Sequence, residues 1–243
     1  MIVYGRNPVR EALRGRRRVT RVWVTGDGRE VDRLVREAER AQGAVEVERV
    51  GSAEAVERLC GSPDHQGVCA DAGDYPYASE DALLVPEDAL VVCLDEVQDP
   101  HNLGAVCRAA ECAGATGVVV PERRSAAVTP AVCSASAGAV EHLPVARVRN
   151  LADFVERAKR RGAWSYGAVA TAQVPYDRPD YRGRVVLVLG SEGRGIRPRV
   201  AAACDELVAL PVRGRVGSLN VSAAAAALLY GILQRRAGVD SVR

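Results

Sequence analysis

Five polar side chains stand where apolar runs of the sequence end, in three separate segments. They are Asn102, Arg108, Glu192, Ser218 and Asn220. A guanidinium and amides donate hydrogen bonds and a carboxylate accepts them, which suits the binding of anions and hydroxyls. In open parallel sheets, ligands bind at the carboxyl ends of the strands. The five side chains therefore indicate a ligand site, provided that the three segments are strand ends.

The first segment, residues 94–108, reads LDEVQDPHNLGAVCR. The pattern predicts a strand, then a turn at Asp99-Pro100, then a helix that Asn102 caps. Arg108 follows inside that helix. A turn and a capped helix with a surface arginine would explain the same residues without any ligand.

The second segment, residues 185–196, reads VVLVLGSEGRGI and predicts a buried strand that runs straight into a glycine-rich loop. Gly190, Gly193 and Gly195 allow backbone groups to approach a ligand closely. Their spacing is not G-x-G-x-x-G and no helix clearly follows, so a dinucleotide-binding fingerprint fits poorly. Glu192 lies in the middle of this loop, with no evident structural role.

The third segment, residues 210–224, reads LPVRGRVGSLNVSAA. It predicts a strand end, a basic loop at residues 213–217, and a helix opened by Ser218, Asn220 and Ser222. A helix start offers free N–H donors and a field that favours anions. A capped helix buried in a core would account for the same pattern.

The elements around these segments predict an α/β protein. From residue 89 onward, apolar runs alternate with helical spacings, which indicates a mainly parallel sheet. Residues 1–73 predict a smaller α/β module, and residues 74–88 a linker. The expected strands are residues 21–25, 45–50, 65–72, 89–96, 117–120, 143–148, 165–170, 185–189 and 206–210. The expected helices are residues 7–13 (capped by Asn7), 29–42 (stopped by Gly43), 53–59 (capped by Ser52), 102–113, 129–136, 151–161 and 218–236.

Composition is that of a globular protein, with 48% hydrophobic and 26% charged residues among 243. The net charge of +2 does not indicate a nucleic-acid binder. Near the amino terminus, however, arginines gather with only Glu11 among them, and such a cluster can neutralise phosphates. A solvated helix end is the alternative. The cluster comprises Arg6, Arg10, Arg14, Arg16, Arg17, Arg18 and Arg21.

Seven cysteines and three histidines show no zinc-binding spacing, so we expect no metal. Most of the cysteines lie in apolar stretches, as small core residues do in a reducing compartment. The sequence shows neither an apolar signal region nor a run of transmembrane length, so we expect a cytoplasmic protein and no membrane partner.

The three segments, in this order, resemble the motifs of the SpoU/TrmH family of RNA 2′-O-ribose methyltransferases. The strings that carry the resemblance are DPHNLGAVCRAAECAG, LVLGSEGRGI and LPVRGRVGSLNVSAAAA. In addition, MIVYGRNPVREAL and HQGV are similar to the amino-terminal domain of the bacterial subfamily that methylates a guanosine in 23S ribosomal RNA.

The resemblance implies a fold that periodicity alone would not give. Residues 89–243 would form a methyltransferase domain with a deep trefoil knot that binds S-adenosylmethionine, although knots are very rare. Residues 1–73 would form a small RNA-binding domain similar to ribosomal protein L30e. The resemblance also implies a homodimer that acts on 23S ribosomal RNA.

The resemblance assigns roles to residues at matching positions. The catalytic group would be Asn102, Arg108, Glu192, Ser218 and Asn220. The cofactor would contact Thr171, Leu189, Gly190, Gly195, Ile196, Leu210 and Leu219. For RNA, the two arginine-rich stretches add Arg6, Arg10, Arg17, Arg18, Arg213 and Arg215.

The implied reaction is an in-line attack of a ribose 2′-oxygen on a sulfonium methyl group. A guanidinium stays protonated, with a pKa above about 12, so we expect Arg108 to hold the target phosphate and stabilise the nascent alkoxide. We expect His101 to be an ordinary loop residue. Three alternatives stay open: a family member acting on transfer RNA or another ribosomal site, a non-catalytic RNA-binding protein, and a dinucleotide-dependent oxidoreductase.

Overall fold

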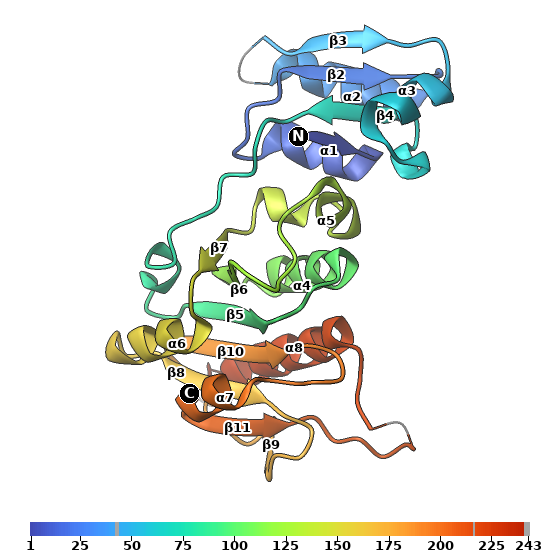
Figure 1. Cartoon of the computed structure of the whole chain (residues 1–243). Helices are drawn as coiled ribbons and strands as arrows, with labels where there is room; N and C mark the ends of the chain where they lie inside the picture. Colours follow the sequence, from blue (N-terminus) through green and yellow to red (C-terminus); the bar gives the residue numbers. More distant parts are fainter. Residues whose placement is uncertain (42–43, 216, 241–243) are drawn as a thin grey trace. The chain divides into compact units, whose positions relative to one another are not determined.

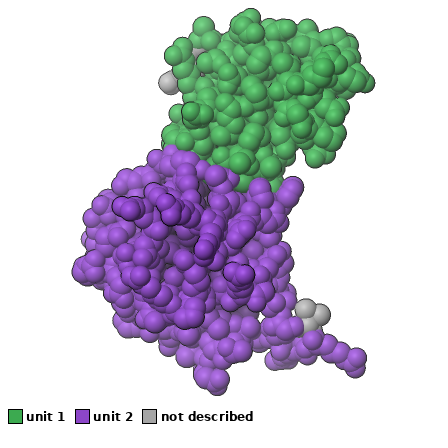
Figure 2. Space-filling model, viewed as in Figure 1, with its two compact units in different colours: residues 1–76, 128–142 green, residues 77–127, 143–243 purple. Residues whose placement is uncertain are grey.

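The computed structural model describes residues 1–41, 44–215 and 217–240. The chain forms two compact units (Figure 2). Unit 1 comprises residues 1–76 and 128–142, and unit 2 comprises residues 77–127 and 143–243. A stretch from the middle of the sequence thus belongs to the unit built by the amino terminus. The three-part division predicted from the sequence stays a prediction, and the units are described separately below.

Unit 1 contains a sheet of four strands in the order β1-β4-β2-β3 (Figure 1). They are β1 (Ile2–Tyr4), β2 (Arg21–Val24), β3 (Glu46–Arg49) and β4 (Val68–Asp71). β4 pairs antiparallel with β1 and β2, whereas β2 and β3 are parallel. The sequence pattern missed β1, because three residues are too few to show a period and its partner lies more than 60 residues downstream.

The helices of unit 1 are α1 (Arg6–Arg14), α2 (Arg29–Arg40), α3 (Ala53–Cys60) and α5 (Pro130–Ala135), with 3₁₀ turns η1 (Pro63–His65) and η3 (Ala139–Glu141). The predicted cap at Ser52 is confirmed, since its hydroxyl accepts from the amide of Ala55 at 3.4 Å. The predicted cap at Asn7 is wrong: Gly5, with φ 92°, precedes a helix that already includes Asn7. The predicted stop at Gly43 lies outside the described residues.

A buried ion pair ties residues 128–142 to the rest of unit 1. The side chains of Arg17 and Glu141 are 2% and 0% exposed, and Arg17 Nε donates to Glu141 Oε2 at 2.8 Å. Burial by itself lowers the pKa of Arg17, but the hydrogen bond and charge of Glu141 raise it overall. Beside this pair, the Tyr75 hydroxyl donates to the carbonyl of Val140 at 3.0 Å. The segment therefore completes the interior of unit 1.

Unit 2 contains a sheet of seven strands in which every pairing is parallel, in the order β7-β6-β5-β10-β8-β11-β9. The mainly parallel sheet predicted from the sequence is confirmed. Parallel strands bring their carboxyl ends to one edge of the sheet. The strands are β5 (Leu90–Asp95), β6 (Gly117–Pro121), β7 (Val145–Val148), β8 (Trp164–Ala168), β9 (Val174–Pro175), β10 (Val185–Gly190) and β11 (Glu206–Ala209).

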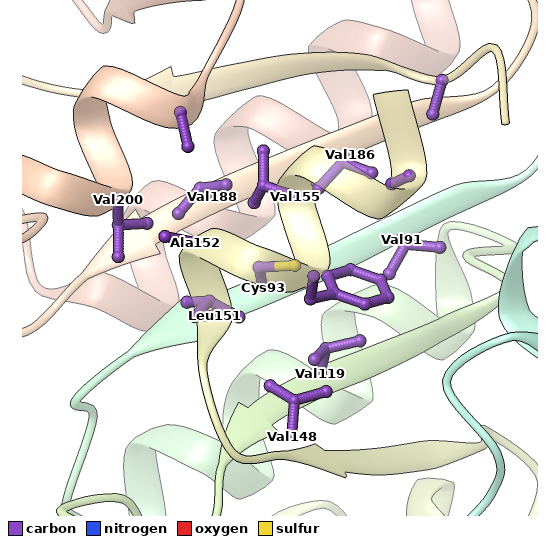
Figure 3. Packing of buried hydrophobic residues seen from close by; sticks show 14 of the residues in the cluster. Val91, Cys93, Val119, Val148, Leu151, Ala152, Val155, Val186, Val188 and Val200 are labelled. Atoms are coloured by element: carbon purple, nitrogen blue, oxygen red, sulfur yellow. The ribbon is translucent and has the colours of Figure 1, made fainter. Parts of the chain in front are cut away.

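Helices cover both faces of this sheet. They are α4 (Pro100–Cys112), α6 (Leu151–Arg160), α7 (Pro198–Ala203) and α8 (Val221–Asp240). α6 packs with α7, and α4 packs with α8 (Figure 1). Alternate strand residues face the two layers. One layer contains Val91, Cys93, Val119, Val186 and Val188, packed on Leu151, Ala152, Val155 and Val200 (Figure 3). This rigid sheet sets the positions of the loops at its carboxyl edge.

Two helix starts in unit 2 differ from prediction. α4 begins at Pro100, and Asp99 is its cap, accepting from the amide of His101 at 2.9 Å. Proline favours the first helical position, so the Asp-Pro pair takes the role predicted for Asn102. α8 begins at Val221, after Ser218 and Asn220. Asn102 is thus free to make other contacts, whereas Asn220 directly precedes α8 and its side-chain oxygen accepts from the amide of Ser222 at 2.8 Å, as a cap does.

The linker predicted at residues 74–88 contains one short 3₁₀ turn, η2 (Ala82–Leu84). In the described part of the chain, no helix is long and apolar enough to cross a membrane. Strand order does not define how a chain is threaded, so the trefoil knot stays a prediction.

Candidate functional site

The loop after β10 folds back tightly on the end of its own strand. A Cβ atom at Gly190 would lie 1.9 Å from the carbonyl carbon of Gly195 and 2.2 Å from the nitrogen of Ile196. The Gly195 amide donates to the carbonyl of Ser191 at 2.9 Å, which closes the loop. Gly193 and Gly195 have φ of 83° and 67°, a region that favours glycine. Residue 190 must therefore be glycine for this loop to close.

An ion pair fixes the far end of the same loop. Asp95, the last residue of β5, is fully buried and accepts from the backbone amide of Arg197 at 2.8 Å and from its Nε at 2.8 Å. Arg197 also pairs with Glu96 at 3.3 Å. Hydrogen bonding to Asp95 raises the pKa of Arg197. The Asp95–Arg197 ion pair thus links the end of β5 to the loop after β10, in addition to the backbone hydrogen bonds between these two strands.

Three of the predicted catalytic residues form one hydrogen-bonded group. Asn102 Nδ2 donates to Glu192 Oε1 at 3.0 Å, and Asn220 Nδ2 donates to Asn102 Oδ1 at 3.0 Å and also to Glu192. The Asn220 Oδ1 accepts from the amide of Ser222 at 2.8 Å, which fixes the orientation of that amide group. The side-chain amides of Asn102, on α4, and Asn220, just before α8, thus hold the Glu192 carboxylate in one orientation.

A cavity of about 310 Å³ adjoins this group. Ser218 and Glu192 line it, together with six of the seven residues predicted to contact the cofactor. Those six are Leu189, Gly190, Gly195, Ile196, Leu210 and Leu219. Its walls are mostly apolar side chains and strand-end backbone, with few polar groups, as in pockets for small organic ligands.

Four of the predicted catalytic and cofactor-binding residues, Asn102, Arg108, Thr171 and Asn220, are not among those lining this cavity. Thr171 is exposed, and its neighbours Val169 and Ala170 line the cavity in its place. Arg108 is exposed on α4 and makes no hydrogen bond or ion pair with any residue that the structure describes. A cationic side chain of this kind is available to a ligand outside the cavity. His101 is likewise exposed, but it lies in the first turn of α4 and not in a loop as predicted.

The predicted RNA-binding arginines differ sharply in their surroundings. Arg6 pairs with Glu30, and Arg10 lies 3.7 Å from Glu37. Arg17 is buried against Glu141, so its guanidinium does not reach the surface. Arg18, Arg213 and Arg215 are exposed. The acids that pair with the amino-terminal cluster come from distant parts of the sequence, which local charge counting overlooks.

The sequence reasoning did not single out Asp95 or Arg197. The signal was present, because Asp95 is a charged residue closing a strand that is otherwise wholly apolar. A buried carboxylate needs a counter-charge. The partner lies 102 residues away, so only the fold identifies it.

Both parts of the chain match known families. Residues 89–230 match the SpoU rRNA Methylase family, and residues 2–78 match a domain described as RNA 2'-O ribose methyltransferase substrate binding. The Bacillus subtilis protein YacO, named for the TrmH family of tRNA/rRNA methyltransferases, is 38% identical over 244 residues. The match covers 96% of this chain and 95% of the relative.

Solved structures of similar proteins cover this chain to different extents. The SpoU methyltransferase AviRb from Streptomyces viridochromogenes, in complex with the cofactor AdoMet, matches 98% of this chain and 90% of its own (TM-score 0.81, 26% identity). The match to the AdoMet-bound rRNA methyltransferase from Sinorhizobium meliloti covers 97% of this chain and 87% of that protein (TM-score 0.78, 25% identity). The match to the TrmH/SpoU tRNA modifying enzyme from A. aeolicus covers 66% of this chain and 82% of that protein (TM-score 0.57, 25% identity).

Proposed function

Because the chain belongs to the SpoU rRNA methylase family and is an S-adenosylmethionine-dependent RNA methyltransferase, we propose that it methylates the 2′-hydroxyl of a guanosine in 23S ribosomal RNA. Family membership sets aside the oxidoreductase and the non-catalytic RNA-binding protein. The observation that carries the proposal is the Asn102–Glu192–Asn220 group beside the cavity, where a carboxylate is aimed at the place of reaction.

Coverage of the chain favours ribosomal over transfer RNA. The Sinorhizobium rRNA methyltransferase matches both units, whereas the A. aeolicus tRNA modifying enzyme leaves about a third of this chain unmatched. The matched substrate-binding domain at residues 2–78 supports the same reading. A transfer RNA or a different ribosomal site is the second candidate.

The cavity fits S-adenosylmethionine. Leu189, Leu210 and Leu219 would enclose the adenine ring, and the backbone at Gly190 and Ile196 would meet its polar edge. When bound, S-adenosylmethionine supplies an electrophilic methyl group on a sulfonium centre. The tight closure at Gly190 fixes that binding surface before the ligand arrives, and positioning of this kind accounts for much of the rate in favourable cases.

The remaining residues act on the RNA. Arg108 holds the target phosphate and stabilises the negative charge that develops on the 2′-oxygen, since an exposed guanidinium with no partner among the described residues is available for both tasks. Glu192, held by two amides, orients the ribose together with Ser218. If Arg108→Lys kept near-normal turnover at saturating RNA, this role for a planar guanidinium would be wrong.

We also propose that the protein is a homodimer, as family resemblance implies. Five large apolar side chains of unit 2 are exposed among the described residues: Val85 (71%), Trp164 (52%), Val212 (42%), Leu219 (52%) and Tyr230 (48%). Contiguous apolar patches mark protein contacts, whereas single exposed apolar side chains are normal, so the proposal rests on the resemblance. Sedimentation equilibrium measures the mass directly, and a monomer at micromolar concentration would contradict the proposal.

The test of function is methyl transfer from labelled S-adenosylmethionine to total RNA from a strain that lacks the gene. The modified ribose is then mapped. One 2′-O-methylguanosine in 23S RNA is the expected result. A product in transfer RNA would favour the second candidate, and no product with free RNA or with ribosomal precursors would overturn the proposal.

A further inference from the structure

A second cavity of about 280 Å³ adjoins the cofactor cavity. The two share a wall made by Ser191, Glu192, Arg194 and Val221. Glu192 is the carboxylate held by Asn102 and Asn220. A group in the second cavity therefore lies next to a ligand in the first, with Glu192 in the wall between them.

The opposite wall is the loop between β5 and α4, residues 96–99, together with Asn102. This loop is held in place at several points. Glu96 has φ 59° and a side chain only 8% exposed, paired with Arg197 at 3.3 Å. The carbonyl of Val97 accepts from the amide of Ala126 at 2.9 Å. A loop anchored in this way offers a preformed surface and needs little ordering when a ligand binds.

The charge of the cavity decides which part of RNA it fits. Its lining holds three carboxylates, those of Glu96, Asp99 and Glu192, and the cation of Arg194. Arg197 and Arg124 pair with Glu96 from outside the lining. Asp99 and Glu192 have no cationic partner among the described residues, so the cavity suits an uncharged part of a nucleotide better than a phosphodiester. Its side chains mostly accept hydrogen bonds, so they suit a base whose edge donates.

Guanine is the RNA base with two adjacent donors on its pairing edge, N1–H and the N2 amino group. Two side chains of the loop are free to accept them. Asp99 uses Oδ1 to cap α4, which leaves Oδ2. Gln98 is exposed, and its side chain makes no hydrogen bond with any residue in the described ranges. A carboxylate and an amide oxygen on adjacent residues match two adjacent donors.

Resting on the proposed function, we propose that this second cavity binds the base of the target nucleotide and that Gln98 and Asp99 read the donor edge of guanine. The ribose then lies at the shared wall beside Glu192. The phosphates lie outside the cavity, where Arg108 is exposed. Gln98 and Asp99 set base specificity and take no part in cofactor binding.

The experiment uses the full-length protein and a 23S RNA fragment that carries the mapped target as guanosine or as inosine, which lacks the N2 amino group. Wild type, Gln98→Ala and Asp99→Asn are compared by kcat/KM on both fragments. Asparagine caps helices as well as aspartate does, so Asp99→Asn preserves the start of α4. Asp177→Asn, an exposed change outside both cavities, is the matched control. Calorimetry gives the Kd for S-adenosylmethionine.

Wild type and the control are expected to prefer guanosine over inosine by roughly 5- to 150-fold, the range for a good base-edge contact. Inosine lacks only the N2 donor, so the variant whose side chain accepted from N2 is expected to lose most of that preference. The variant whose side chain accepted from N1–H is expected to lose kcat/KM on both fragments alike. The Kd for S-adenosylmethionine should stay unchanged in both. An unaltered ratio in both variants would overturn the inference alone, as would a mapped target other than guanosine. Wild type that modifies no RNA would overturn the proposed function, and this inference with it.

Discussion

Arginine is abundant in both units of the molecule, yet its surroundings differ between them. In unit 1, arginines near the amino terminus mostly meet carboxylates: Arg14 lies 2.8 Å from Glu37, Arg21 pairs with Glu46, and Arg17 is buried with Glu141. In unit 2, Arg124 pairs with Glu96, but other exposed arginines have no ion-pair partner among the described residues. They include Arg108, Arg194, Arg213 and Arg215. Paired arginines hold a fold together, and unpaired ones are available to RNA.

The buried pair is the strongest test of this contrast. Glu141→Ala would leave Arg17 as a buried cation without a counter-charge, and should lower the free energy of unfolding by about 3–5 kcal/mol. Urea denaturation followed by circular dichroism measures the change. Glu30→Ala removes the exposed partner of Arg6 and is the matched control, with little effect expected. If Glu141→Ala and Glu30→Ala both lowered the free energy of unfolding by the same small amount, the buried Arg17–Glu141 pair would be no more important for stability than the exposed Arg6–Glu30 pair.

An unpaired arginine should matter for turnover and not for stability. Arg108→Ala is expected to lower kcat by roughly 100- to 1000-fold, the range for losing one preorganised group that stabilises developing charge. Its unfolding midpoint and its Kd for S-adenosylmethionine should stay unchanged. Arg36→Ala, also exposed but in unit 1 and outside the predicted RNA-binding set, is the control. Single-turnover methyl transfer measures both, and a similar small loss in the two variants would contradict the assignment.

A change in the backbone of the loop after β10, residues 191–196, should have an effect of intermediate size. Gly190→Ala forces the 191–196 loop away from the end of β10, because the added methyl group overlaps the backbone of Gly195. Overpacking of this kind costs about 1–3 kcal/mol, so S-adenosylmethionine should bind roughly 5- to 150-fold more weakly by calorimetry. Gly214→Ala is the control, since a Cβ atom there meets nothing within 4 Å. Unchanged affinity in Gly190→Ala would mean that the loop does not shape the cofactor site.

The smallest effect concerns contacts with RNA phosphates. Arg213→Ala and Arg215→Ala should each weaken RNA binding and reduce the slope of log K against log salt by about 1. Arg6→Ala and Arg10→Ala remove side chains that already face Glu30 and Glu37, so their slopes should change less. Filter binding at several salt concentrations measures all four. A larger change in the unit 1 variants would reverse the contrast between the two regions.

Much of the fold follows from local sequence. The strands β5 and β10 are continuous apolar runs, typical of strands covered on both faces, and they lie side by side in the sheet. The glycine-rich loop after β10 was recognisable because glycine at a strand end has few other uses. The roles of Asn102, Glu192 and Asn220 came from family resemblance, and the structure brings these three side chains within hydrogen-bonding distance.

What the sequence did not predict involves partners far apart in the chain. Asp95 meets Arg197 and Arg17 meets Glu141 across more than 100 residues, and no periodicity links such positions. Asn102 was predicted to cap α4 because asparagine is a common cap residue at the start of a helix. Asp99 is an equally common type of cap, and in the structure it is Asp99 that caps α4. Local rules identify which residues are able to cap or pair, and the fold decides which of them do.

The assignment of residues 128–142 to unit 1 limits how genes for such proteins can recombine. A chimera joined near residue 77 would bring in a foreign amino-terminal module but keep the host stretch that carries Glu141. The foreign module would then have to supply an arginine at the position of Arg17, or leave an acid buried alone. Exchange of residues 1–76 together with residues 128–142 therefore requires three junctions, near residues 77, 128 and 143, so the two stretches are expected to be inherited together.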